Sequence, residues 1–159
     1  MSRFLERVPA ASTAGLDLDH YRLVAGFLDS SRSSAPAEII QDIRITCTSP
    51  ASRDTLLRSL TEVVATVRAE ASKPGGTADV LTYMAFASLD DNVCARIFGR
   101  WRTRDGLERF IRRGDVNGFW KENKENLRAK EQRLYVPNGK GWLHRGSGFA
   151  GVKGEKSML

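Results

Sequence analysis

The residues with the clearest capacity for chemistry in this sequence lie on two neighbouring apolar segments, residues 79–89 and 93–101. Tyr83 lies on the first segment, where its phenol either exchanges a proton with a ligand oxygen or lies half-buried at the edge of a sheet. Trp101 ends the second segment, and an indole there either forms the wall of a ligand cavity or packs in an ordinary core. Both interpretations stay open for each residue.

The segment that ends at Trp101 has two chemically different faces. Because side chains alternate along a strand, Ile97 and Gly99 share the face of Trp101, and a cavity on that face should be apolar. Arg96 and Arg100 lie on the opposite face, where they could bind an enolate or a carboxylate, or form interface salt bridges. The alternation therefore predicts an apolar aromatic face and a basic face on one strand.

Two polar side chains outside these segments are further candidates. Asn117 lies on a predicted helix, where it either holds a ligand carbonyl group at the cavity mouth or is exposed. His144 titrates near neutral pH and has Trp142 and Phe149 close to it in sequence. This Gly-rich segment is either a lid over the cavity or unstructured.

The elements that must position these residues follow from local patterns. Residues 90–92 are Asp-Asp-Asn between two β-rich segments, which predicts a hairpin. Thr103 is a good N-cap residue for a helix over 104–113. The other predicted elements are a strand over 39–48, a long helix over 52–73, a helix from Asp115, as its cap, to about Leu127, and a strand over 132–137.

The chain divides into three parts. Residues 1–36 form an N-terminal arm, in which the helical spacing of Tyr21, Val24, Ala25 and Leu28 predicts a short helix. Residues 37–137 form the main domain, and residues 138–159 form a Gly-rich tail with four basic groups and one acidic group.

The order of elements in the main domain is β-α-β-β-α-β, with the second helix split in two. This order predicts an α+β, ferredoxin-like fold. Its helices cover one face of the sheet and leave the other face bare and apolar. A second copy of the chain is the expected cover, so we expect a homodimer that forms an α/β barrel.

Several short motifs in this order resemble the antibiotic biosynthesis monooxygenase family of the dimeric α/β-barrel superfamily, over about residues 38–136. The motifs are Arg68-Ala-Glu70 before a Pro-Gly break, Val80-Leu-Thr-Tyr83, Ser88-Leu-Asp-Asp-Asn92, Phe98-Gly-Arg-Trp101, Thr103-Arg-Asp-Gly-Leu107 and Phe119-Trp120. In anthrone-type oxygenases of this family the tryptophan lies against the substrate. Two polar positions of those relatives fall on Ile97 and Leu107 here.

The resemblance implies a cofactor-independent monooxygenase of secondary metabolism that uses O₂ on an aromatic or polyketide-type substrate, with neither flavin nor metal. A cofactor-free isomerase or cyclase is the alternative enzyme. A dimeric protein that binds a hydrophobic metabolite without turnover is the alternative outside enzymes. The catalytic candidates are Trp101, Tyr83 and Arg100. The substrate-binding candidates are Ile97, Gly99, Phe86, Leu107, Phe110, Asn117, Phe119, Trp120 and His144.

Composition restricts the classes of binding partner and the cellular compartment that we expect for this protein. The formal charge of +6 and the run of arginines over 102–113 permit nucleic-acid binding, but interleaved acidic residues favour a solvated helix face. We expect neither a nucleic-acid nor a membrane partner. The absence of a signal-peptide core and the presence of only two cysteines, Cys47 and Cys94, predict buried free thiols in a cytoplasmic protein. The ending Ser157-Met-Leu159 offers a peroxisomal address as the alternative.

Overall fold

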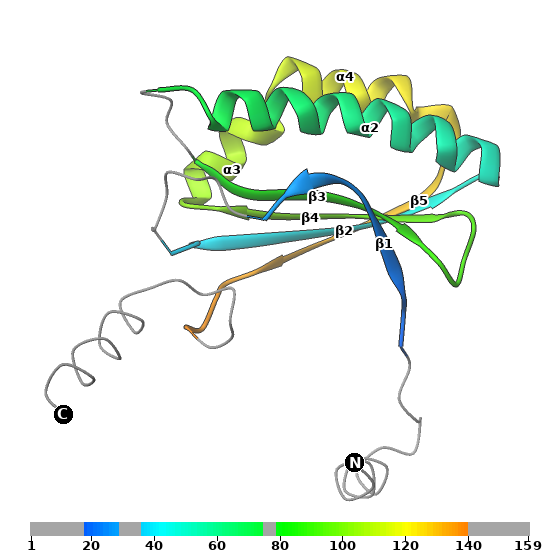
Figure 1. The fold of residues 1–159 in the computed structure, drawn as a ribbon, viewed down its shortest axis with the longest axis horizontal. Coiled ribbons are helices and arrows are strands. Elements are labelled where there is room, and N and C mark those ends of the chain that lie inside the picture. The colour runs from blue at the N-terminus through cyan, green and yellow to red at the C-terminus, as the bar shows by residue number, and fades with distance from the viewer. Residues whose placement is uncertain (1–17, 29–35, 75–78, 140–159) are drawn as a thin grey trace, which may run out of the picture.

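The computed structural model describes residues 18–28, 36–74 and 79–139. In this part of the chain one sheet lies beneath three α-helices (Figure 1). The elements in chain order are β1 (Tyr21–Phe27), β2 (Ile39–Cys47), α2 (Pro50–Ala71), β3 (Val80–Ser88), β4 (Cys94–Trp101), α3 (Arg104–Ile111), α4 (Gly114–Glu122), the 3₁₀ helix η2 (Lys124–Asn126) and β5 (Leu127–Tyr135).

The sheet has the strand order β1-β3-β4-β2-β5, and every neighbouring pair is antiparallel. Without β1, the order β3-β4-β2-β5 is that of a ferredoxin-like fold, in which the first and third strands of the motif are central. The predicted α+β class and the split second helix, α3 followed by α4, are therefore confirmed.

Helix α2 is held to the sheet by one apolar side and begins at a well-formed cap. Ser49 is the N-cap, and its hydroxyl accepts a hydrogen bond from the backbone N–H of Ser52 at 3.0 Å. Pro50 occupies the first turn, where its missing N–H has no intrahelical role. The buried residues of α2 are Leu56, Leu57, Leu60, Val63, Val64 and Val67. Each contributes about 1.5–3 kcal/mol by the usual value for a fully buried aliphatic side chain.

The helix predicted for the N-terminal arm is wrong, because the chain forms strand β1 there. β1 pairs with β3 and has a bulge between Leu23 and Ala25. The extra residue at the bulge lets Val24 and Ala25, which are adjacent in sequence, both pack against the core. Just before β1, the backbone N–H of His20 donates to Asp90 Oδ2 at 2.6 Å and attaches the strand to the β3–β4 turn.

Two further boundaries differ from the predictions. Arg113 is the N-cap residue of α4, and Asp115, the predicted cap, lies in the first turn. A carboxylate in that turn is favoured by the helix dipole. β5 begins at Leu127, five residues before its predicted start. Its side chains are largely exposed, so the apolar alternation that marks a half-buried strand is missing there.

The two faces of the sheet differ in burial. Ile43, Ile45, Ala85 and Ile97 point toward the helices and are almost fully buried.

Cys47 and Cys94 are buried free thiols, as predicted, and burial raises the pKa of both. Among the described residues, none of the helices is both long and apolar enough to cross a membrane.

Candidate functional site

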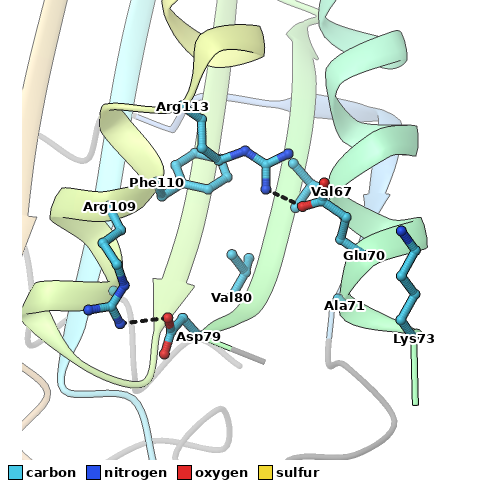
Figure 2. A pocket seen from close by; sticks show the side chains of 10 residues that line it. Val67, Glu70, Ala71, Lys73, Asp79, Val80, Arg109, Phe110 and Arg113 are labelled. Atoms are coloured by element: carbon cyan, nitrogen blue, oxygen red, sulfur yellow. Dashed lines mark hydrogen bonds and ion pairs between the residues drawn. The ribbon is translucent and has the colours of Figure 1, made fainter. Parts of the chain in front are cut away.

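A cavity of ≈ 410 Å³ opens between the end of α2, helix α3 and the start of β3 (Figure 2). Cavities of about 300–1,000 Å³ are common for small-molecule sites. Buried apolar side chains form its inner part, and charged side chains form its rim. The lining residues are Val67, Glu70, Ala71, Lys73, Asp79, Val80, Gly106, Arg109, Phe110 and Arg113.

Helix ends position these side chains. α2 stops after Ala71, where the backbone N–H of Ser72 donates to the carbonyl of Arg68 at 3.1 Å. Thr103 is the N-cap of α3, as predicted, and its hydroxyl accepts from the backbone N–H of Gly106 at 3.0 Å. A Cβ on Gly106 would lie 2.9 Å from the Cβ of Asp79. Glycine at this position therefore lets α3 approach the start of β3.

Arg113 is the most strongly held cation at the rim. Its Nε and Nη2 donate to the two carboxylate oxygens of Asp115 at 2.9 and 2.7 Å, and its Nη1 donates to Oε2 of Glu70. The guanidinium also lies 5.6 Å from the centroid of the Phe110 ring. The hydrogen bonds from Arg113 lower the pKa of Asp115, and their carboxylate partners raise the pKa of Arg113. Arg113 therefore connects α2 to the α3–α4 junction across the cavity (Figure 2).

A second ion pair lies at the outer end of the cavity. Arg109 Nη2 donates to Asp79 Oδ2 at 2.7 Å, and this hydrogen bond raises the pKa of Arg109. Arg109 is largely exposed, whereas Asp79 retains only 15% of its side-chain exposure. The exposed arginine can leave this pair without unfolding the site, because solvent screens its charge.

Beneath the cavity, three aromatic rings pack edge to face. Phe110 lies 5.0 Å from Tyr83 and 5.2 Å from Trp101 between ring centroids. Trp101 is fully buried, and its six-membered ring covers Gly99. The indole Nε1 of Trp101 is buried with no hydrogen-bond partner among the described residues. Trp101, which was expected at the cavity wall or in the core, thus lies one side-chain layer below the cavity, and Phe110 separates it from the cavity.

Tyr83 is almost completely buried, with 4% of its surface exposed. Burial raises the pKa of its phenol, the charge of Asp115 raises it further, and Arg113 opposes the change. The phenol is therefore neutral near pH 7. In that state Tyr83 is a proton donor rather than a base.

The structure places the next group of predicted site residues in three environments, and one of these residues lies outside the part of the chain that it describes. Ile97, Leu107 and Phe119 are buried in the core beneath the helices. Trp120 is half-buried, with the ammonium of Lys130 3.7 Å from its ring centroid. Asn117 is exposed on α4. His144 lies outside the described residues.

Arg100 and Phe86 lie on the open sheet face, opposite Trp101. Arg100 is 3% exposed, and its Nη1 donates to the hydroxyl of Thr82 at 3.3 Å. Phe86 lines a second hollow of ≈ 410 Å³ with Tyr21, Asp42, Arg96, Phe98 and Tyr135. Arg96 is paired with Asp42, with Nε 2.6 Å from Oδ1. As predicted, none of the described helices covers this face (Figure 1), but the face is mixed and not uniformly apolar, because Phe86 and Phe98 lie beside the Arg96–Asp42 pair.

The site residues predicted from the sequence did not include the charged residues of the cavity rim. Arg109 and Arg113 were assigned to a solvated helix face, yet both line the cavity. Their spacing of four residues in the helix predicted over 104–113, with Phe110 next to one of them, was the available signal, because residues four apart share a face of such a helix; in the structure Arg113 lies just after α3, as the N-cap of α4. Glu70 and Asp79 carried no comparable signal, since they come together with the arginines only through the fold.

No family model matches this chain, and no curated protein sequence matches it. Solved structures, in contrast, do match this chain in their fold. PA3566 from Pseudomonas aeruginosa is 22% identical, with a TM-score of 0.54 over 66% of this chain and 97% of that protein. A Deinococcus radiodurans protein, provisionally named an antibiotic biosynthesis monooxygenase, is 13% identical, with a TM-score of 0.56 over 65% of this chain and 95% of its own.

A Fusobacterium nucleatum protein provisionally named a monooxygenase has a TM-score of 0.63 and 10% identity, over 85% of this chain and 61% of its own. Identities this low establish a common fold and leave the activity open. The resemblance predicted from the motifs is confirmed at that level: the chain has the ferredoxin-like fold of structures provisionally named antibiotic biosynthesis monooxygenases.

Proposed function

We propose that this protein is a cofactor-independent monooxygenase that oxidises an aromatic or polyketide-type substrate in the cavity between α2 and α3. The observation that carries the proposal is the combination of a charged rim with a floor of packed aromatic rings. Phe110 offers a flat apolar surface to a fused-ring substrate, and the arginines offer positive charge to an oxygen atom that becomes anionic.

The substrate supplies the electrons in this mechanism. Loss of a proton from an anthrone-type CH₂ group gives a stabilised carbanion, which transfers electrons to O₂. One oxygen atom forms a new carbonyl on that carbon, whose two hydrogens leave with the second oxygen atom as water. The protein holds the substrate away from bulk water and stabilises the anion before oxygen reacts.

Each side chain has a separate proposed role. Arg113 and Arg109 stabilise the anionic oxygen at the rim. Trp101 packs against Phe110 from below, 5.2 Å between ring centroids, and holds that ring in place as the apolar surface for the substrate. Tyr83 supports Phe110 as a neutral phenol. Arg100 has no role in this cavity, because it lies on the other sheet face.

The test is oxygen uptake by the full chain with dithranol, an anthrone, in buffer containing a metal chelator. We expect uptake above the rate of heat-denatured protein, and one labelled oxygen atom in the quinone product when ¹⁸O₂ is used. Phe110→Leu should lower this rate, whereas Phe119→Leu should not. Phe119 is an equally buried phenylalanine that does not line the cavity. A rate no higher than that of the denatured control would refute the oxygenase proposal.

An isomerase or cyclase is the second candidate, because two carboxylates, Glu70 and Asp79, line the same cavity. Carboxylates can transfer protons between positions of a bound substrate without any oxidant. The mass of the product separates the two reactions: oxygenation changes it, and isomerisation leaves it unchanged. Binding without turnover would instead support a carrier of hydrophobic metabolites.

We also propose that the open sheet face pairs with a second copy of the chain. Acidic and basic residues alternate there, including Asp42, Arg44, Arg96, Glu131 and Arg133. A two-fold contact can place such a face against itself with opposite charges opposed. Light scattering should give the mass of a dimer, and Phe98→Asp should give a folded monomer. A wild-type monomer would contradict the pairing.

A further inference from the structure

We propose that the cavity selects aromatic ligands that carry an acidic oxygen, and that this oxygen takes the place of Glu70 at Nη1 of Arg113. The inference rests on the proposed use of the cavity and specifies its substrate class. Three observations lead to it: how Arg113 is fixed, where Glu70 is placed, and how the guanidinium lies relative to Phe110.

Arg113 keeps its position without Glu70. Asp115 holds Nε and Nη2 through two hydrogen bonds of 2.9 and 2.7 Å, which fixes the plane of the guanidinium group. The Nη1 atom is bonded separately, to Glu70 on α2. Departure of Glu70 therefore leaves a charged donor at the cavity with its orientation intact. A preorganised donor of this kind binds an oxyanion with little reorganisation.

Glu70 is the more easily displaced of the two carboxylate partners. It lies one residue before the end of α2, where the partial negative charge of the helix C-terminus disfavours an anion. Its side chain is 46% exposed, against 32% for Asp115 and 25% for Arg113. Asp115 has the opposite placement, in the first turn of α4, where the dipole favours a carboxylate. An incoming anion should therefore exchange with Glu70 and leave Asp115 bound.

The position of Phe110 adds the aromatic requirement. The Arg113 guanidinium lies 5.6 Å from the Phe110 ring centroid, and both side chains line the cavity (Figure 2). A ligand oxygen at Nη1 therefore places the rest of the ligand next to this ring. Lys73 and Arg109 line the same cavity, so two further cationic side chains lie beside Arg113 near a bound anion.

The test compares two probes of the same shape, anthraquinone-2-carboxylate and anthraquinone-2-carboxamide, by calorimetric titration of the full chain. We expect the carboxylate to bind about tenfold more tightly than the amide, in line with one charge-assisted hydrogen bond. Glu70→Gln removes the competing charge and should increase affinity for the carboxylate about fivefold while leaving the amide unchanged. Arg113→Gln should abolish the preference.

Arg112→Gln is the matched control, because Arg112 is an exposed neighbour that does not line the cavity. It should retain the preference for the carboxylate. The Glu70→Gln variant keeps the test decisive even where Arg113→Gln fails to fold. Equal affinity for both probes, with a loss on Phe110→Leu, would overturn this inference and leave the proposed cavity in place. Absence of binding by either probe would overturn both.

Discussion

The contact between Gly99 and Trp101 gives the sharpest test of how the cavity floor is built. A Cβ at position 99 would lie less than 3.0 Å from Cη2 and Cζ3 of the indole. Non-bonded carbon atoms pack at about 3.5–4.0 Å, so in Gly99→Ala the ring must retreat by more than about 1 Å. The ring is completely buried and has no space into which to retreat at no cost.

Overpacking of this kind costs about 1–3 kcal/mol. Replacing a strand glycine by alanine gains about 0.5–1 kcal/mol from the smaller entropy loss of the backbone. A retreat of more than 1 Å puts the cost at the upper end of the overpacking range, about 2–3 kcal/mol, so the net loss for Gly99→Ala should be about 1–2.5 kcal/mol, which lowers Tm by about 2–10 °C at this chain length. Urea denaturation and thermal unfolding, both followed by circular dichroism, measure the two quantities.

Gly118→Ala is the matched control, because a Cβ at Gly118 in α4 would meet nothing within 4 Å. It should stabilise the protein by about 0.5–1 kcal/mol, the usual difference between glycine and alanine inside a helix. The two alanine substitutions should thus have opposite signs. The double variant Gly99→Ala with Trp101→Phe should cost less than the sum of the single changes, because the smaller ring makes room. Strict additivity, or a neutral Gly99→Ala, would refute the packing argument.

Three other predictions concern the attachment of β1, the stability of the fold at low pH and the cavity rim. Gly26→Ala should detach β1 from β3, because Gly26 has φ 144° and its new Cβ would lie 2.6 Å from the β3 backbone. Backbone amides along the edge of β3 should then exchange hydrogen faster, and unchanged exchange rates there would contradict this prediction. Arg113 lowers the pKa of Asp115, so this carboxylate stabilises the fold above its unfolded pKa of about 3.9, and the contribution is lost as pH falls through the folded pKa. The stability difference between wild type and Asp115→Asn should therefore shrink below about pH 4 in urea titrations, and a constant difference would show that the ion pair does not contribute. Gly106→Ala should push Asp79 away from its ion pair with Arg109 and so strengthen binding of anthraquinone-2-carboxylate about fivefold, by the same reasoning as Glu70→Gln, whereas equal affinity would place the ligand elsewhere.

The sequence predicted the fold well where one periodicity held along a whole element. The segment that became α2 repeats its apolar residues at helical spacing, and the two strands around residues 90–92 are bounded by turn residues. The N-terminal arm failed because a bulge at Val24 changes the phase of the alternation in the middle of a strand. With that shift, Tyr21, Val24 and Ala25 show a spacing that fits a helix as well as a bulged strand.

The site was harder to predict than the fold, because its charges come together only in three dimensions. Alternation correctly placed Trp101 and Gly99 on one face of β4 and Arg100 on the other. It carried no information on how far beneath the helices a side chain lies, and Phe110 from α3 covers the indole. Pairing of Arg113 with Glu70 depends on how the start of α4 lies beside the end of α2, which no local pattern in the chain encodes.

The arrangement of charges also limits the chemistry of the cavity. Arg109 has Asp79 as its internal partner, and Arg113 has Glu70 and Asp115, so a neutral ligand would gain nothing from either cation. An anion can gain by exchange, and the exchange is selective because Asp115 continues to hold Arg113 while Glu70 leaves. A substrate that becomes anionic only after deprotonation would gain this interaction at that stage rather than on binding. Stabilisation confined to the reactive form is what accelerates a reaction rather than merely strengthening binding. A cavity built in this way therefore suits a substrate whose own anion reacts with oxygen.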